Sequence, residues 1–377
     1  MMSNFKGIEL IRAEKNGTFE SEVEECLGRL KALTENKEKR SWIIDVIINS
    51  ISFPDFKTRE SLIKDGIRTI LGKSNYVLTV IPQKLVNNQI IIQATPLKSI
   101  EDSIVNADCL HIKTDEGDLL VASFVSFTGE VDKDSIFCFE KVKQCLTKYN
   151  LDFGDVVRQW NYIGHILSST FGKFNYQVLN DIRSDFYNNS SFPNGYPAAT
   201  GIGMDYPGII IKIIALKANP DIQIVALDNP SQIPAYKYSE RVLPGKTDLL
   251  TVQKATPKFE RAKAIISDQT VTLFVSGTAS IIGELTIGKD SPEEQTKTVL
   301  DLISQLISLK NLSPFRKDLS SVNLLCKSLV IYVKRQKDAP IISSIIETLL
   351  PGIPYLLTEA DVCRDELLVE IECIFEG

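Results

Sequence analysis

Histidine is scarce in this sequence of 377 residues, because only His111 and His165 occur and neither belongs to an H-x-x-x-H or H-E-x-x-H pattern. A histidine-based metal centre or a Ser-His-Asp triad therefore has little material. The seven cysteines are scattered, odd in number and without a C-x-x-C pair, which argues against a zinc site and a disulfide framework. We expect the chemistry to rest on carboxylates, arginine, tyrosine or cysteine.

Long apolar runs and cationic clusters are also lacking. No stretch approaches the roughly 18 to 20 apolar residues that span a bilayer. Residues 1–6 carry one cation with no apolar run behind it, so we expect no membrane span, no secretory signal and a cytoplasmic location. Lys and Arg number 42 against 48 Asp and Glu, and they do not gather with aromatic residues, which makes nucleic acid a poor partner. The 44% of hydrophobic residues is typical of a packed globular protein.

One order of elements occurs three times along the chain. In the first unit the hydrophobic periodicity predicts strand, helix, strand, helix, strand and strand. The order starts again at Leu119 and at Val271, and Gly129-Glu130 and Gly283-Glu284 occupy the same place in their units. The predicted elements of the first unit are 7–14, 20–33, 42–51, 58–71, 76–81 and 89–95.

The repeat predicts an α+β fold of three like units, at 1–100, 118–218 and 219–377, with a linker at the start of the third. Each unit is large enough for a core of its own. Strands followed by long amphipathic helices favour mixed sheets with helices on one face. Three such units in one chain can form an intrachain pseudo-trimer, so we expect a monomer.

The units resemble the RidA (YjgF) fold, known as a homotrimer with ligand sites in the clefts between subunits. Over roughly residues 150 to 377 the motifs are similar to those of the chorismatase family. That family hydrolyses or rearranges chorismate and releases pyruvate without a metal or organic cofactor, which implies a chorismate-like dicarboxylate as the small-molecule partner. The motifs are Val157-Arg-Gln-Trp-Asn-Tyr-Ile163, Tyr176-x-x-Leu-Asn-x-x-Arg183, Pro197-Ala-Ala-Thr-Gly-Ile-Gly203, Pro257-x-Phe-x-Arg261-Ala262, Leu273-Phe-Val-Ser-Gly-Thr-Ala-Ser-Ile281 and Ala360-Asp-Val-Cys-Arg364-x-x-Leu-Leu-Val-Glu-Ile-Glu372.

The resemblance makes Glu370 the catalytic acid that protonates the methylene of the enolpyruvyl group. Strand alternation independently puts Leu368, Glu370 and Glu372 on one face. A carboxyl group desolvated in a cleft has a raised pKa, as a general acid at neutral pH requires. The plainer interpretation is that one or both glutamates face solvent.

Chorismate carries two carboxylates, for which arginine is the usual partner. By resemblance Arg183 and Arg261 bind them, although surface ion pairs are the commoner fate of arginine. Tyr176 and Tyr187 lie nearby in sequence and can add hydroxyl hydrogen bonds, or can be core aromatics on a helix.

Cys363 stands where chorismatases that form 3-hydroxybenzoate carry a cysteine, which favours that product over a dihydroxy-cyclohexadiene carboxylate. We place a second discriminating position near Ala279. Two features depart from the family: Gly283-Glu284-Leu285 replaces a frequent His-Glu, and an aromatic loop is poorly matched by residues 231–238. Substrate specificity can therefore differ.

Two other functions remain open on the same fold. One is hydrolysis of reactive enamines or imines, as in RidA proteins, and the other is ligand binding without catalysis. An RNase activity is disfavoured by the acidic charge and the shortage of histidine. Incubation with chorismate, followed by detection of pyruvate and an aromatic product, separates these functions.

Overall fold

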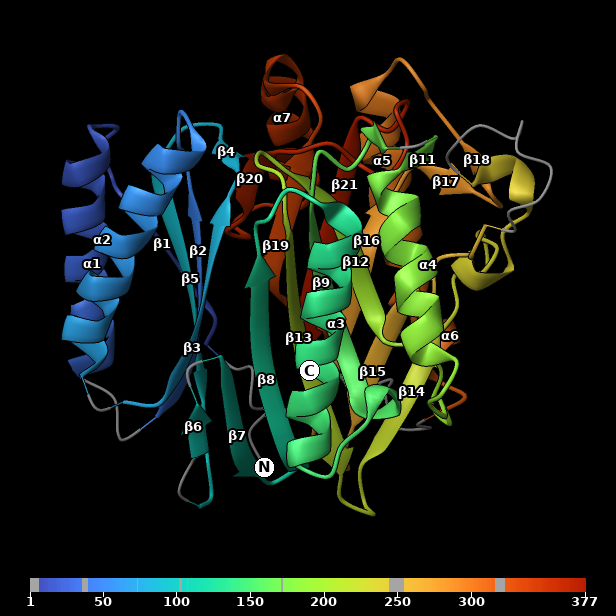
Figure 1. The fold of residues 1–377 in the computed structure, drawn as a ribbon. Coiled ribbons are helices and arrows are strands. Elements are labelled where there is room, and N and C mark those ends of the chain that lie inside the picture. The colour runs from blue at the N-terminus through green and yellow to red at the C-terminus, as the bar shows by residue number, and fades with distance from the viewer. Residues whose placement is uncertain are drawn as a thin grey trace.

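Three large β-sheets, each with helices on one face, and two two-stranded sheets make up the described part of the protein (Figure 1). A computed structural model describes residues 7–35, 40–72, 74–101, 104–106, 108–170, 172–243, 254–315 and 323–377. Residues 1–6, on which the expectation of no secretory signal rests, lie outside the described residues. The mixed α+β class and the mixed sheets agree with the prediction. Within the described ranges, no helix is both long enough and apolar enough to cross a membrane.

The first sheet has the strand order β1-β5-β2-β3, in which β2 and β3 are parallel and the other pairs are antiparallel. All eight residues of β2 are buried, because α1 and α2 cover one face and the other sheets cover the second. The elements are β1 Glu9–Arg12, α1 Phe19–Glu35, β2 Ser41–Ile48, α2 Phe53–Leu71, β3 Tyr76–Pro82 and β5 Ile90–Leu97.

Helix α2 begins at Phe53, earlier than the predicted start at residue 58. The Ser52 hydroxyl accepts a hydrogen bond from the Asp55 backbone N–H at 3.3 Å, and Pro54 lies in the first turn. A serine cap followed by proline is a strong helix start, which the apolar spacing alone did not reveal.

The second sheet has the order β12-β9-β13-β8-β7-β6, and α3 and α4 pack on its outer face. Strands β6 and β7 fall in the polar stretch between the first two predicted units. The elements are β6 Ile104–Asn106, β7 Cys109–Thr114, β8 Gly117–Ser126, α3 Val131–Lys148, β9 Val156–Gly164, β10 Ser169–Thr170, β11 Lys173–Phe174, α4 Asn175–Tyr187, β12 Ala198–Met204 and β13 Ile209–Ala218.

The third sheet has the order β14-β15-β16-β21-β19-β20-β4, and α5 and α7 pack on one face. Its last strand, β4, lies between β3 and β5 in the chain and pairs with β20. The elements are β4 Lys84–Leu85, β14 Gln223–Leu227, β15 Ala262–Ile266, β16 Val271–Ala279, β17 Ile281–Ile282, β18 Leu285–Thr286, α5 Pro292–Leu306, α6 Leu309–Leu312, β19 Leu325–Val333, α7 Ala339–Leu349, β20 Leu356–Glu359 and β21 Val369–Glu376.

The three sheets share one four-strand core. The corresponding orders are β1-β5-β2-β3, β8-β13-β9-β12 and β16-β21-β19-β20. In each core the first two pairs are antiparallel and the last pair is parallel. Each sheet also has an outer hydrophobic cluster under its helices, and one central cluster draws residues from all three sheets. The helix-free faces of the sheets therefore pack against one another.

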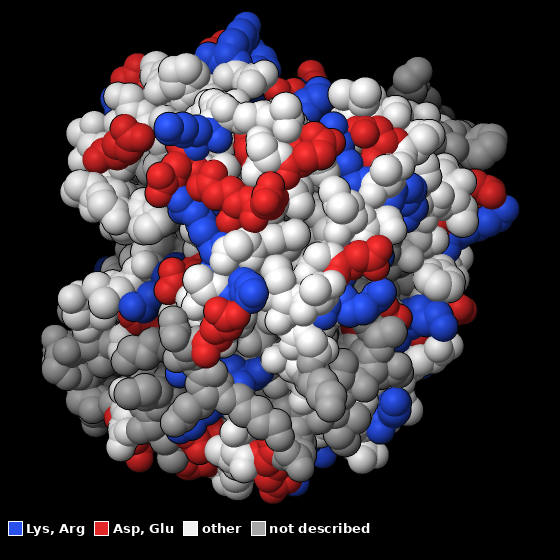
Figure 2. All heavy atoms as spheres, turned by 90° about the vertical axis from the view of Figure 1, so that its left-hand side faces the viewer, with Lys and Arg blue, Asp and Glu red and all other residues white. Residues whose placement is uncertain are grey.

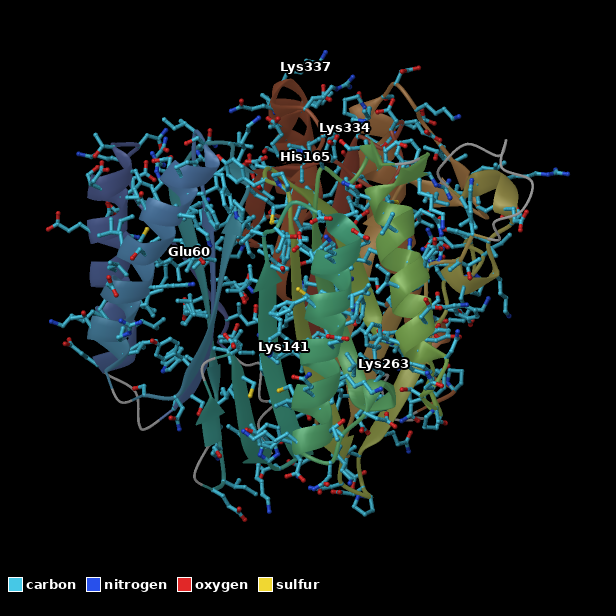
Figure 3. The ribbon with its side chains drawn as sticks, in the orientation of Figure 1. Glu60, Lys141, His165, Lys263, Lys334 and Lys337 are labelled. Carbon is cyan, nitrogen blue, oxygen red and sulfur yellow. The ribbon has the colours of Figure 1, made fainter. Side chains whose placement is uncertain are left out.

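Polar contacts also join the sheets and cover the surface. Lys263 on β15 (Figure 3) is fully buried, and its Nζ donates to the carbonyl oxygens of Asn194 at 2.7 Å and Gly195 at 2.9 Å. Lys263 thereby holds the loop before β12 against the third sheet. On the face shown in Figure 2, acidic and basic side chains are interspersed. Arg29 illustrates this pattern, because it pairs with Glu14 and Glu25.

Candidate active site

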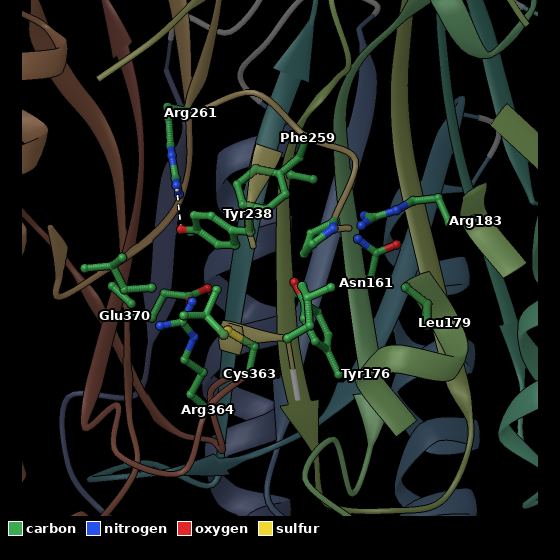
Figure 4. A pocket seen from close by; sticks show the side chains of 18 residues that line it. Asn161, Tyr176, Leu179, Arg183, Tyr238, Phe259, Arg261, Cys363, Arg364 and Glu370 are labelled. Carbon is green, nitrogen blue, oxygen red and sulfur yellow. Dashed lines mark hydrogen bonds between the residues drawn. The ribbon is translucent and has the colours of Figure 1, made fainter. Parts of the chain in front are cut away.

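A cavity lies where edge strand β12 of the second sheet meets β16 and β21 of the third (Figure 4). It contains about 710 Å³ of space not filled by atoms, part of it open to solvent. The second sheet and α4 contribute Asn161, Tyr176, Leu179, Arg183, Ala199 and Gly201. The third sheet and its loops contribute Tyr238, Val242, Leu243, Pro257, Phe259, Arg261, Gly277, Ala279, Ile281, Cys363, Arg364 and Glu370.

Glu370 on β21 is the only carboxyl group that lines this cavity among the described residues. Its side chain is 4% exposed, and no described group donates a hydrogen bond to its carboxyl oxygens. Burial, followed by the nearby charge of Glu372, raises the pKa of Glu370 to about 8, against smaller opposing effects of Arg158 and Arg261. Glu370 therefore carries its proton at neutral pH, as a general acid must.

Strand alternation places Glu370 as the sequence predicted. Val369, Ile371 and Cys373 pack in the cluster under α5 and α7, whereas Glu370 and Glu372 point to the opposite face of β21. Both glutamates are buried, so the alternative of solvent-facing side chains is wrong.

Gly277 makes room for the acid. A Cβ atom at Gly277 would lie 2.0 Å from Oε1 of Glu370, too close for any side chain without movement of the carboxyl group. The pairing of β16 with β21 shifts register between Val275 and Thr278, which places Ala279 opposite Glu370. The cavity wall facing the acid is thus built from the smallest residues.

Arg183 and Arg261 lie on opposite sides of the same cavity (Figure 4). Arg183 is 3% exposed and donates from Nη2 to Oδ1 of Asn180, while its Nε has no partner. Arg261 donates from Nη2 to the Ile233 carbonyl at 2.7 Å and to the Tyr238 hydroxyl at 2.6 Å, and its Nε also has no partner. Buried N–H groups without partners are unusual, so both guanidinium groups have donors available for a ligand.

Of the two predicted tyrosines, the structure brings only Tyr176 to the cavity wall. Tyr187 lies in an aromatic cluster with Phe139 and Phe153, and its hydroxyl donates to Oε1 of Gln159 at 2.8 Å. Gln159 in turn donates to Oδ1 of Asn161, which lines the cavity. Tyr187 is therefore two hydrogen bonds away from the site.

Cys363 and Arg364 come from the loop between β20 and β21. Burial and the charge of Glu370 raise the pKa of Cys363 to about 12, so this residue is a neutral thiol at physiological pH. Arg364 was not predicted as a site residue, although it stands in the terminal motif. Its Nη1 donates to the Glu284 carbonyl at 2.9 Å.

The two departures from the family motifs meet at this site. The Glu284 carboxylate accepts hydrogen bonds from the Ser239 backbone N–H at 2.8 Å and the Ser239 hydroxyl at 2.7 Å. Ser239 follows Tyr238, which lines the cavity, so Glu284 fixes the loop that carries Tyr238. Glu284 itself does not line the cavity.

The corresponding strands of the other two sheets carry no acid at the position of Glu370. The corresponding position in each sheet is identified by its partner, an inward-facing residue of the neighbouring strand. Two residues further along each strand stand Gln93, Lys212 and Glu372, which line one common cavity. The pairs are Ile91 with Ile47, Ile210 with Tyr162 and Glu370 with Tyr332. No three His, Cys, Asp or Glu side chains within the described ranges gather as a metal would require.

The arrangement is that of an α+β protein with one small-molecule cavity that presents a buried acid and three arginines. Residues 101–215 match the family model described as chorismatase FkbO/Hyg5-like, N-terminal. The chain is 30% identical over 234 residues to a 3-hydroxybenzoate synthase of Streptomyces hygroscopicus, covering 58% of this chain and 63% of that protein. It is 27% identical over 228 residues to a chorismatase of the same organism, covering 59% and 62%.

The fold comparison extends over the whole chain. A chorismatase crystal structure superposes with a TM-score of 0.68 at 19% identity, covering 97% of both chains. The sequence matches span less than two thirds of the curated relatives' length. The chain is thus similar in sequence to these proteins over part of its length, and it has the fold of the chorismatase structure.

Proposed function

We propose that this protein is a chorismatase-type enzyme that protonates the enolpyruvyl group of chorismate and releases pyruvate without a metal or organic cofactor. The observation that carries the proposal is the pKa of Glu370, raised to about 8, in a cavity that also presents Arg183 and Arg261. A protonated carboxyl group beside fixed cations suits an acid-catalysed reaction of a dianionic substrate.

The proposed reaction begins with proton transfer from Glu370 to the methylene carbon of the enolpyruvyl double bond. The π electrons form the new C–H bond, and the ether oxygen stabilises the oxocarbenium ion that remains. In the hydrolytic branch water adds to this cation and returns a proton to Glu370, and the hemiketal collapses to pyruvate and a ring alcohol. The branch to 3-hydroxybenzoate needs no net water, because that product and pyruvate together contain all the atoms of chorismate.

Arg183 and Arg261 are proposed to bind the two substrate carboxylates. The unpartnered Nε of each is a donor that a carboxylate can satisfy in a bidentate contact. Arg364 lies on the same wall as Glu370 and adds a third positive charge. Tyr176 and Asn161 supply neutral polar groups between the cations.

We propose 3-hydroxybenzoate as the favoured product, because Cys363 lies beside Glu370 in the cavity and one relative is named for that product. Cys363→Ala is expected to leave pyruvate release measurable and to shift the ring product away from 3-hydroxybenzoate. Chromatography of the products tests this. An unchanged product from the alanine variant would remove Cys363 from the branching step.

The function is tested by incubating the protein with chorismate and measuring pyruvate. Glu370→Gln keeps the shape of the side chain and removes the acid, so the rate should fall by at least the roughly 10²- to 10⁴-fold of general acid catalysis. Glu293→Gln on the surface of α5 is the matched control, because its carboxylate is exposed and pairs only with Lys297 among described residues. Pyruvate release at the wild-type rate by Glu370→Gln would refute the assignment of the acid.

We also propose that the units 1–100, 118–218 and 219–377 pack as a pseudo-trimer of RidA-like units. The shared order of the four core strands supports this proposal, as does the central cluster to which all three sheets contribute. In this arrangement the cavity around Glu370 is an inter-unit cleft.

A further inference from the structure

A second, inner cavity lies beside the first one along β21, on the face of the strand that points to the centre of the molecule. Strands of all three sheets line it, so it is bounded by residues far apart in sequence. Its polar and aromatic lining consists of Asp45, Gln83, Gln93, Arg158, Trp160, Tyr162, Lys212, Ser328, Tyr332 and Glu372.

Glu372 is held in this cavity by three donors. It accepts hydrogen bonds from Nη2 of Arg158 at 2.6 Å, from Nε1 of Trp160 at 3.0 Å and from the hydroxyl of Thr200. The side chain is 7% exposed. The guanidinium partner and the two further donors satisfy this buried carboxyl group with charge-assisted hydrogen bonds.

A second ion pair balances the first. Lys212 contacts Asp45 at 2.5 Å, and the two are 4% and 8% exposed. The indole ring of Trp160 joins the pairs, because Nζ of Lys212 lies 4.6 Å and Cζ of Arg158 lies 4.5 Å from its ring centre. The four buried charges of Asp45, Lys212, Arg158 and Glu372, here called the inner charge cluster, therefore sum to zero.

Glu372 lies two residues from Glu370 on the same face of β21, roughly 6 to 7 Å along the strand. Ionisation of Glu370 would place a second negative charge near that of Glu372. The inner charge cluster is already neutral, so it has no excess positive charge to compensate the added one. Groups that face Glu370 from other elements also act on it. They are Arg158 on β9, Tyr176 on α4, Arg261 before β15, Tyr332 on β19 and Cys363 before β21, while Arg183 on α4 and Arg364 before β21 line the same cavity.

We propose that Glu372 is a positioning residue that keeps Glu370 protonated, and that Arg158 fixes Glu372 as the anion that does so. The proposal rests on the function assigned to Glu370 and adds the source of its proton affinity. The proposal also involves the first sheet. Asp45 on β2 pairs with Lys212, so Arg158 remains the cationic partner of Glu372.

A purely structural role of the inner charge cluster has a different signature. An ion pair that only joins the sheets changes the free energy of unfolding when it is removed, without moving the titration of Glu370. The decisive measurement is therefore the titration of Glu370 itself. The infrared carbonyl band of its protonated carboxyl group, identified by its loss in Glu370→Gln, reports this in the substrate-free protein.

Glu372→Gln should move the titration midpoint of Glu370 to lower pH by about one unit, the size of effect of one nearby charge. In the pyruvate assay the alkaline limb of the pH profile should move in the same direction. Glu372→Asp keeps the charge and should leave the midpoint near that of wild type. Glu293→Gln is the control for loss of a distant carboxylate, and it should cause no shift.

Glu372→Gln leaves Arg158 unpaired and can impair folding, so the double variant Arg158→Gln/Glu372→Gln is the second arm. The effect of Glu372 on Glu370 exceeds that of Arg158, so the midpoint should still fall, by less. An unmoved midpoint in a folded variant overturns the proposal. A shifted midpoint in a protein that leaves chorismate intact refutes the proposed function instead, because the titration needs no substrate.

Discussion

At the residue scale, the site depends on one carboxyl group that is costly to bury as an anion. The pKa of Glu370 is about 8 in the folded protein and about 4.5 when exposed. Between these values the folded chain holds a proton that the unfolded chain releases. The free energy of unfolding therefore contains a contribution that is complete at low pH and is lost as pH rises through this window.

Glu370→Gln should remove this pH dependence. We expect the variant to be more stable than wild type above pH 8 and closer to it near pH 4.5, because glutamine has no charge to desolvate. Melting temperatures from scanning calorimetry across this range provide the measurement. Parallel melting curves for the two proteins at all pH values would contradict the raised proton affinity of Glu370.

Arg183→Lys keeps a positive charge but loses the planar fork and the free Nε donor. We expect weaker chorismate binding by about 1 to 3 kcal/mol, the range for hydrogen bonds to charged groups. The matched control is Arg241→Lys, which changes an exposed arginine outside the cavity lining. Calorimetric affinities for chorismate in the inactive Glu370→Gln background test the pair, and equal affinities for wild type and Arg183→Lys would exclude Arg183 from binding.

Part of the site was predictable from the sequence. Alternation along β21 gave the direction of Glu370, and the motifs gave Arg183, Arg261 and Cys363 as candidates that the structure brings to one cavity. Tyr238 was not predicted as a site residue. Its position depends on the hydrogen bonds between Glu284 and Ser239, which are 45 residues apart in the sequence. Contacts of this length leave no periodic signal.

At the scale of elements, β16 acts as the wall against which the acid is held. Gly277→Ala would bring Cβ to 2.0 Å from Oε1 of Glu370 and 3.1 Å from Cγ2 of Thr200. The carboxyl group is the flexible partner, so we expect it to move by about 1 Å and the rate to fall by about 10²-fold with little change in stability.

Gly28→Ala on α1 is the control for this prediction. A Cβ at Gly28 meets nothing within 4 Å, and alanine is the better helix former, so stability should rise by up to about 1 kcal/mol with an unchanged rate. Pyruvate release and thermal melts of both variants make the comparison. A Gly277→Ala enzyme with full activity would show that the wall does not position the acid.

Most elements were predictable because their apolar spacing is local. The predicted helix at 20–33 and strand at 76–81 correspond to α1 and β3 within two residues. No element was predicted at β14 or β15. They form because β14 pairs with β15 and β15 pairs with β16, which only the folded chain brings together.

At the scale of the molecule, the inner faces of three sheets are already buried against one another within one chain. Trimerisation would gain nothing for these faces, so we expect a particle of about one chain mass, 42.1 kDa. Light scattering coupled to size exclusion measures it. A stable mass of three chains would contradict the proposed pseudo-trimer.

The sequence predicted that one order of elements occurs three times along the chain, but it did not predict the pairing of β4 with β20. Strand β4 closes the edge of the third sheet by pairing with β20. Two residues are too few for a periodic pattern, so only the assembled chain reveals that the segment between β3 and β5 completes the third sheet.

Ile91 and Ile210 occupy the positions in the first and second sheets that Glu370 occupies in the third. This difference affects how the sequence of the protein can evolve. In a symmetric trimer every substitution occurs in three copies, so no cleft can change without the others. Here a tight inhibitor should titrate to a stoichiometry of one per chain. Of the three corresponding strands only β21 carries the acid, so the positions of Ile91 on β5 and Ile210 on β13 are free to be optimised for packing.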